Sequence, residues 1–193
     1  MSPPYQQRRG AVWASAAVMI AGTLARGAAL AGAQSPGPVS APVPSTPTLG
    51  HERLAFFDGR WTVEGLPRER QFREQCAWME GGRRHVVCRS RSRAATGEWR
   101  EGYSIFSYRP SDSTYLYHGF RAGGAVETMT GKATTDGWAF QSESGTGPAR
   151  QRLLVTITRL TSGGFHLIDA TATGDGAFVV GDTVRYVRLP VVR

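Results

Sequence analysis

The sequence contains almost no lysine and none of the common catalytic motifs. Lys132 is the only lysine among 23 basic residues, a bias that is typical of a GC-rich genome. No G-x-S-x-G nucleophile turn, H-E-x-x-H zinc helix or G-x-x-x-x-G-K-[ST] phosphate loop occurs in the chain. The two cysteines do not form a set with zinc spacing. These absences argue against the enzyme classes that use such motifs, and they predict a non-enzymatic protein with no metal and no cofactor.

The sequence also lacks an apolar run long enough to span a membrane. The apolar, small-residue-rich stretch from residue 11 to about 24 is shorter than the roughly 20 residues of a spanning helix. It follows Arg8 and Arg9 and precedes Ala31-Gly32-Ala33, which resembles a signal peptidase site. Residues 1–33 are therefore predicted to be a signal peptide, with an uncleaved anchor as the alternative. We expect the processed protein to be periplasmic or extracellular and not an integral membrane protein.

Residues 34–50 are predicted to be a solvated linker, because they are rich in proline, serine and threonine. The folded domain is predicted to span residues 51–193. Removal of the signal would take Arg8, Arg9 and Arg26 from the 23 basic residues and none of the 15 acidic ones, which leaves a net charge of about +5. This charge favours anionic surfaces such as lipid head groups, and it does not by itself indicate a nucleic-acid partner.

The folded part shows no sustained helical period after one short helical candidate, HERLAFFDG. Short runs rich in β-branched and aromatic residues alternate instead with Gly, Pro, Ser and Asp turns. They predict ten strands at about 60–66, 70–78, 84–93, 98–109, 114–121, 124–132, 137–143, 150–160, 164–173 and 178–189. Short links make consecutive strands pair as hairpins, and closure removes the exposed edges. The prediction is an all-β, antiparallel meander closed into a roughly ten-stranded barrel with a short N-terminal helix.

The two cysteines support this pairing. A hairpin centred on Gly82 places Cys76 opposite Cys88, and facing residues of an antiparallel pair lie at a distance that a disulfide accepts. An oxidising compartment favours the bond, and closing so small a loop contributes about 3 kcal/mol. Two buried free thiols are the alternative.

Gly59-Arg60-Trp61, after the short helical segment, resembles the opening of the lipocalins and other calycins. In that family the tryptophan closes one end of the barrel and an arginine of the last strand packs over it. The resemblance implies that Trp61 closes the barrel here and that Arg185 or Arg188 packs over it. Residues 50–190 also resemble a family of exported bacterial lipocalin-like domains of unknown function, through motifs such as Cys76-Ala-Trp-Met-Glu-Gly-Gly82 and Val87-Cys88-Arg89-Ser90. One calycin branch, the nitrobindins, binds haem through a late-strand histidine, but residues 179–189 contain none.

Aromatic and polar residues on neighbouring predicted strands are candidates for lining a cavity. If Gly123 and Gly124 form a two-residue turn, His118 faces Met129 and lies diagonal to Glu127. A hydrogen-bonded pair near the rim is the simpler interpretation, and small barrels are often filled by side chains. The candidate cavity residues are Tyr103, Tyr115, Tyr117, His118, Glu127, Met129, Trp138 and Phe140.

Arginines are concentrated between Arg68 and Arg100, and Arg89, Arg91 and Arg93 alternate onto one strand face. This arginine row is a candidate anion contact, with ion pairs to Glu69, Glu74, Glu98 and Glu101 as the simpler explanation. The leading hypothesis is an exported binding protein for a small apolar or lipid-like ligand in the barrel. The alternatives are an envelope interaction module that uses the arginine row on an anionic surface, and an enzyme at the barrel mouth using His118 or His166 with Asp169 and a serine.

Overall fold

The computed structural model describes residues 48–67, 70–79 and 82–190, all within one compact unit that spans residues 43–193. The predicted signal peptide and nearly all of the predicted linker lie outside the described residues. Among the residues described, no helix is long and apolar enough to cross a membrane.

The described chain forms one short α-helix, three 3-10 turns and ten strands. The helical elements are α1 (Leu49–Arg53), η1 (Leu54–Phe56), η2 (Pro110–Asp112) and η3 (Gly147–Ala149). The strands are β1 (Gly59–Val63), β2 (Gln71–Trp78), β3 (His85–Arg93), β4 (Trp99–Arg109), β5 (Thr114–Phe120), β6 (Val126–Ala133), β7 (Gly137–Ser144), β8 (Gln151–Arg159), β9 (Phe165–Thr173) and β10 (Val179–Arg188).

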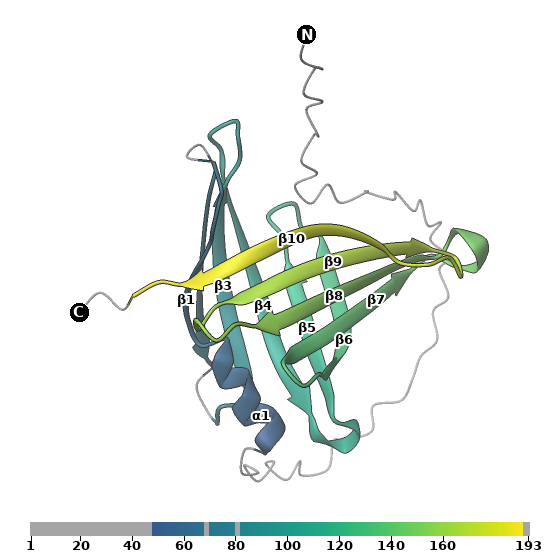
Figure 1. Ribbon diagram of the computed structural model, residues 1–193, viewed down its shortest axis with the longest axis horizontal. Helices are drawn as coiled ribbons and strands as arrows, with labels where there is room; N and C mark the ends of the chain where they lie inside the picture. Colours follow the sequence, from purple (N-terminus) through teal and green to yellow (C-terminus); the bar gives the residue numbers. More distant parts are fainter. Residues whose placement is uncertain (1–47, 68–69, 80–81, 191–193) are drawn as a thin grey trace, which may run out of the picture. The chain divides into compact units, whose positions relative to one another are not determined.

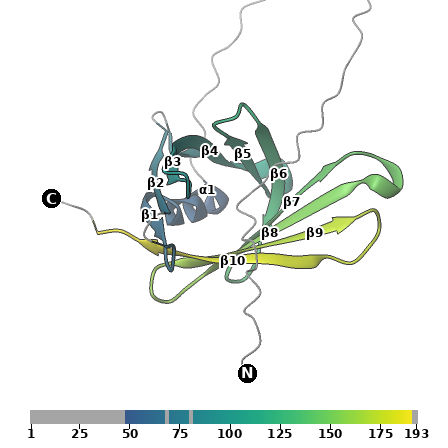
Figure 2. The ribbon, with the colours of Figure 1, turned by 90° about the horizontal axis from the view of Figure 1, so that it is seen from above.

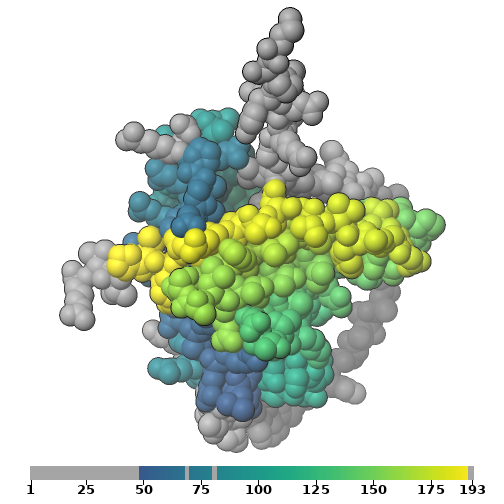
Figure 3. All heavy atoms as spheres, in the orientation of Figure 1, coloured from purple at the N-terminus to yellow at the C-terminus, as the bar shows by residue number. Residues whose placement is uncertain are grey.

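Every strand pairs antiparallel with its neighbours in sequence, and β1 pairs with β10 to close the barrel. Figure 1 shows α1 at one end of this barrel, and Figure 2 shows the strands from above. In the space-filling view β10 crosses the front of the molecule (Figure 3). The predicted fold class, a ten-stranded antiparallel meander closed into a barrel, is confirmed.

The helix begins earlier than predicted. It starts at Leu49, inside the segment predicted as linker, because Thr48 and His51 cap it: the Thr48 backbone N–H donates to Nδ1 of His51 at 3.2 Å. His51 is buried and meets the Tyr108 ring edge-on at 5.3 Å between centroids. The helix is therefore docked to the barrel through its first turn.

The predicted disulfide is confirmed. Cys76 and Cys88 are directly opposite each other on β2 and β3 and form a disulfide with a Cα–Cα separation of 3.9 Å. Both side chains are buried. Because side chains alternate along a strand, this bond shows which members of β2 and β3 point inward.

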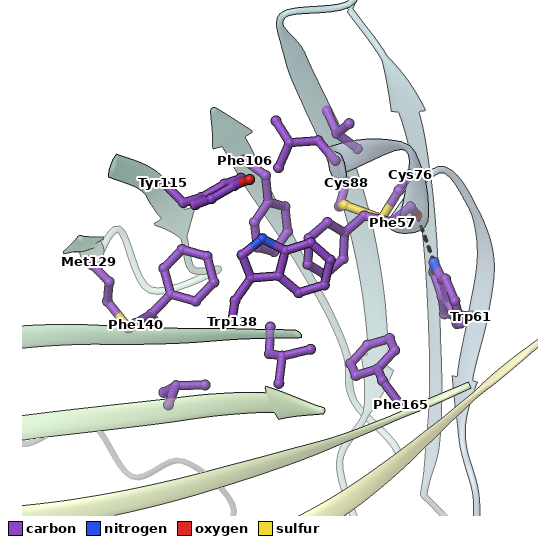
Figure 4. Packing of buried hydrophobic residues seen from close by; sticks show 14 residues of the cluster. Phe57, Trp61, Cys76, Cys88, Phe106, Tyr115, Met129, Trp138, Phe140 and Phe165 are labelled. Carbon is purple, nitrogen blue, oxygen red and sulfur yellow. Dashed lines mark hydrogen bonds between the residues drawn. A yellow bond between two sulfur atoms is a disulfide. The ribbon is translucent and has the colours of Figure 1, made fainter. Parts of the chain in front are cut away.

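An aromatic core seals the barrel at the α1 end, which we call the sealed end. Figure 4 shows Trp138 at the centre of this core, beside Phe57 and Phe106. The Phe57 ring stacks on Phe106 with centroids 4.3 Å apart and lies 4.7 Å from the centroid of Trp138. Chain segments far apart in sequence thus meet in one packed cluster, and α1–η1 acts as its plug. The buried aromatic members of this core are Phe57, Trp61, Phe106, Tyr115, Trp138, Phe140 and Phe165.

Trp61 and Arg188 complete the sealed end. The indole N–H of Trp61 donates to the Phe57 carbonyl at 2.8 Å, as drawn in Figure 4. The Arg188 guanidinium lies 4.4 Å from the Trp61 ring centroid and donates to the carbonyls of Asp58 and Phe56. Gly59 has φ +135°, and a Cβ there would collide with Arg188. Of the two arginines predicted for this position, Arg188 fills it, whereas Arg185 forms an exposed ion pair with Glu64 at 2.7 Å.

Candidate functional site

Six of the eight predicted cavity residues do point into the barrel, but four of these fill it. Tyr115, Met129, Trp138 and Phe140 are at most 5% exposed and belong to the aromatic core cluster. They are therefore packed against protein rather than available to a ligand. The other two, Tyr117 and Glu127, are half-buried and belong to a different part of the interior.

The placement of Tyr103 inside the barrel is wrong. On β4 the inward positions are even-numbered, as the buried Ser104 and Phe106 show, so Tyr103 faces outward. Its side chain is 46% exposed, and its ring lies under the Arg89 guanidinium at 5.9 Å.

The predicted His118–Met129 pairing is also wrong by one residue. Arg121 and Ala125 are joined by a backbone hydrogen bond, so the turn between β5 and β6 holds three residues instead of two. His118 consequently faces Thr128, and Met129 faces Tyr117. A one-residue shift of register turns a side chain to the other face of the sheet. His118 therefore lies on the outer face, hydrogen-bonded to Thr128 at 3.3 Å.

The same alternation separates the residues of the hypothetical catalytic triad. On β9 Phe165 and Asp169 point inward, whereas His166 points outward. Neither His118 nor His166 therefore faces Asp169. The described strands do not assemble the nucleophilic site considered from sequence.

The arginine row lies on the outer face, as predicted. Arg89 donates to both oxygens of Glu101, at 3.1 and 2.9 Å, and Arg91 contacts the same carboxylate at 3.1 Å. Arg93 donates to the Gly97 carbonyl. Of the other predicted partners, Glu98 pairs with Arg100, Glu69 is outside the described residues, and Glu74 is inside the barrel.

Five polar or charged side chains converge inside the barrel beyond the aromatic core, and we call them the interior cluster. They come from β2, β5, β6 and β10 and from the residue that follows β5. The Arg121 guanidinium donates to Glu127 Oε2 at 2.7 Å and to the Tyr117 hydroxyl at 3.3 Å. The members of the interior cluster are Glu74, Tyr117, Arg121, Glu127 and Tyr186.

The interior cluster rests directly on the aromatic core. The Tyr186 ring stacks on Phe165 with centroids 4.4 Å apart, and the Tyr117 ring lies 5.1 Å from that of Phe106. Gly119 makes room for the Tyr117 phenol, because a Cβ there would lie 2.8 Å from the hydroxyl oxygen. The two phenols therefore present their hydroxyls away from an apolar floor.

Glu74 lies at the inner edge of the interior cluster, next to the disulfide. A carboxylate oxygen of Glu74 lies within 4.8 Å of the sulfur atoms of Cys76 and Cys88. Both sulfurs are bonded to each other, so these three residues do not form a set of metal ligands. Glu74 also pairs with Trp61 across β1 and β2.

Burial governs the ionisation of the interior cluster. Burial raises the pKa of the Glu74 carboxyl to about 7, although the nearby Arg121 charge opposes the change. Burial likewise raises the pKa of Tyr117 to about 12, and it raises the pKa of Tyr186. Near neutral pH both phenols are neutral hydrogen-bonding groups, and Glu74 exchanges between its neutral and charged forms.

The cluster end of the interior keeps some solvent access. Glu74, Tyr117 and Tyr186 are surrounded by protein on most or all sides. Each nevertheless retains part of its accessible surface, unlike the almost fully buried core residues. These three residues are therefore less completely covered than the aromatic core.

Two shallow depressions lie elsewhere, on the outer surface. One, of about 470 Å³, is formed by the turns around Pro148 and Gly174, beside the Arg150–Asp175 ion pair. The other, of about 330 Å³, lies beside Lys132 and Gln141 on the outer face of β6 and β7. Neither is lined by a member of the interior cluster.

Sequence reasoning missed Glu74 and Arg121 as interior residues. Side chains alternate between the two faces of a strand, so Glu74, two positions before the inward-facing Cys76, could have been placed on the inner face from the sequence. The signal for Arg121 was weaker, because its inward position depends on the register of the turn that follows it.

These features define a class: a closed, ten-stranded antiparallel β-barrel with one sealed end and a charged interior at the other. A scan of known protein families finds no model that matches this chain, and a search of curated proteins finds no match. The site must therefore be interpreted from its own chemistry.

Proposed function

We propose that this is an exported, calycin-like binding protein that holds a small, largely apolar molecule in the cluster end of its barrel. The observation that carries the proposal is a half-buried set of charged and phenolic groups set on an aromatic floor. Ligand sites commonly combine an apolar lining with a few placed polar groups. The aromatic floor would contact the apolar part of the ligand, and the interior cluster would orient its polar end.

Three features support the calycin resemblance and export. The Arg188 guanidinium covers Trp61 at the sealed end, as the family pattern implies. The strand order is a simple closed meander. The Cys76–Cys88 disulfide suits an oxidising compartment outside the cytoplasm.

Native mass spectrometry of the processed protein, purified from its own host, tests the proposal. We expect a species heavier than the bare polypeptide, and binding of the neutral lipophilic dye Nile red once that ligand is removed. If only the bare polypeptide mass is found and the dye does not bind, the proposal is wrong.

A matched pair of tyrosine variants locates the site. Tyr117 and Tyr103 lie on neighbouring strands but on opposite faces. We expect Tyr117→Ala to weaken Nile red binding by about tenfold or more, equivalent to about 1.4 kcal/mol, and Tyr103→Ala to leave it unchanged. Far-UV circular dichroism checks that both variants keep the fold. Equal losses in the two variants would exclude the interior as the site.

The outer face of β3 and β4 supports a second candidate function, attachment to an anionic surface. Arg89 and Arg91 share the single carboxylate of Glu101, which leaves an excess of positive charge. Trp99 and Tyr103 are exposed beside them, and the Arg91 guanidinium lies 5.1 Å from the Trp99 ring centroid. Exposed arginines interleaved with Trp and Tyr suit the head-group region of a membrane.

Co-sedimentation with vesicles that contain phosphatidylglycerol tests this second function. We expect salt-sensitive binding that is lost when Arg89, Arg91 and Arg93 are all changed to Glu. The matched variant with Lys at the same three positions keeps the charge and should still bind. Binding that survives the charge reversal would exclude the arginine row as the contact.

A further inference from the structure

We infer that the ligand of the interior cluster is a lipophilic cation, with the carboxylate of Glu74 as the counter-ion of its protonated amine. This inference rests on the proposed function and names the chemical class of the ligand. It depends on the charge balance of the interior, on the hydrogen bonding of Glu74 and on the aromatic rings around it.

The inward-facing charges of the cluster are predominantly negative. Glu74 and Glu127 contribute two carboxyl groups against the one guanidinium of Arg121. Asp169 adds an inward carboxylate on β9, and its buried Oδ1 has no hydrogen-bond partner among the described residues. Among the interior cluster and Asp169, carboxyl groups thus outnumber guanidinium groups by three to one. A ligand that enters this interior gains more from a positive than from a negative charge.

The single guanidinium is already engaged. Arg121 donates to Glu127 at 2.7 Å and to the Tyr117 hydroxyl. An anionic ligand would have to compete with the Glu127 carboxylate for this guanidinium. Charge-assisted hydrogen bonds of this kind are stronger than neutral ones, so the competition is unfavourable.

Glu74 is the cluster member that lacks such a partner. No described residue donates a hydrogen bond to its carboxylate or forms an ion pair with it, and the residue is half-buried. A buried acceptor without a partner is costly, and a buried charge is stabilised by an opposite charge. A protonated amine supplies both the hydrogen-bond donors and the positive charge.

The rings near Glu74 favour the same ligand. A charge on Glu74 contributes to the raised pKa values of the Tyr117 and Tyr186 phenols. Phe72 meets the Tyr186 ring edge-on at 5.5 Å between centroids. Cations bind well against the faces of aromatic rings. An amine beside Glu74 would therefore meet aromatic rings as well as the carboxylate.

Isothermal titration calorimetry with three probes that share one tail tests the inference: octylammonium, octanoate and octanol. With the processed protein at pH 8, we expect octylammonium to bind at least about tenfold more tightly than octanoate or octanol. At pH 6 the preference should shrink, because Glu74 becomes neutral. The other charged or titratable groups that face Glu74 are Arg121, Glu127, Tyr117 and Tyr186. The Glu74 pKa of about 7 places the change between these two measurements.

Glu74→Gln is the key variant, and Glu98→Gln is its matched control, because Glu98 is exposed to solvent and paired with Arg100. We expect Glu74→Gln to remove the preference for octylammonium while octanol binding persists, and Glu98→Gln to keep the preference. Persistence of octanol binding shows that Glu74→Gln still folds.

The outcomes separate this inference from the proposed function. Tighter binding of octanoate, or equal binding of all three probes, would overturn the cationic ligand and leave the apolar binding site standing. An unchanged preference in Glu74→Gln would also overturn it. If none of the three probes and no lipophilic dye binds, the proposed function itself fails.

Discussion

The two ends of the barrel interior are built from the same strands but differ in chemistry. At the sealed end β2, β5 and β10 contribute Cys76, Tyr115 and Arg188, which join or cover a packed aromatic core. A step of two residues along each strand leads to Glu74, Tyr117 and Tyr186, which form the interior cluster. One alternating pattern of side chains therefore supplies both regions, and a single step of two residues leads from the packed core to polar and charged groups.

Residues that stabilise the fold and residues that we propose to bind a ligand thus lie at different positions along the same strands. The sealed end holds the buried side chains that the fold needs, whereas the cluster end carries groups that destabilise the protein when they are buried without partners. Substitutions at the two ends should therefore have different signatures.

The largest effect is expected at the sealed end. Trp138 is fully buried and packs against Phe57 and Tyr115. Trp138→Ala should lower the free energy of unfolding by about 3–5 kcal/mol, because it leaves a cavity in the core. Urea unfolding measures this loss. The interior-cluster variant Tyr117→Phe keeps the ring, and it should cost about 1 kcal/mol or less. Similar losses in both variants would contradict the division between the ends.

A smaller effect, of opposite sign, is expected from Glu74→Gln. The carboxyl of Glu74 has its pKa raised to about 7 in the folded protein, against 4.5 as its ordinary value. The folded state therefore binds more protons than the unfolded state between these values, and stability falls as the pH rises from about 4.5 to about 7.

Glu74→Gln should remove that fall. Without ligand, the stability of the variant relative to the unmodified protein should therefore rise by about 1–3 kcal/mol between pH 4 and pH 8. Urea unfolding at the two pH values measures it, with the exposed Glu98→Gln as the control. A pH dependence that Glu74→Gln leaves unchanged would show that Glu74 is not the group that titrates.

The smallest effect is expected on the outer face. Glu101 is exposed, and the Arg89 guanidinium that donates to it lowers the pKa of its carboxyl. Exposed ion pairs contribute little to stability. Glu101→Gln should leave the urea midpoint unchanged while it increases vesicle binding, because two arginines lose their shared partner. A clear loss of stability would mean that the outer face supports the fold.

The fold was predictable because its signals are local and repeated. Turn residues separate short alternating strands, and a symmetric count around Gly82 was enough to pair Cys76 with Cys88. The sealed end was predictable in part, since the helix, Trp61 and a late arginine follow a recognisable order.

The interior cluster was harder to predict, because it depends on register. Gly123 and Gly124 permit either a two-residue or a three-residue turn, and the choice decides whether His118 or Tyr117 points inward. The sequence analysis also grouped Glu74 with the arginine row of the next strand, whereas Glu74 points inward and the row points outward. That distinction follows from the disulfide position and the closure of the barrel.

The pairing of β1 with β10 has a consequence for biogenesis. Arg188 reaches the carbonyls of Asp58 and Phe56, more than 100 residues earlier in the chain. Contacts of such long sequence separation form late, since they close the largest loop. A chain that emerges in the direction of synthesis cannot complete its ring until the final strand arrives, whereas the β2–β3 hairpin can be oxidised well before then. Thiol oxidation would thus join β2 to β3 before the last strand docks between β1 and β9.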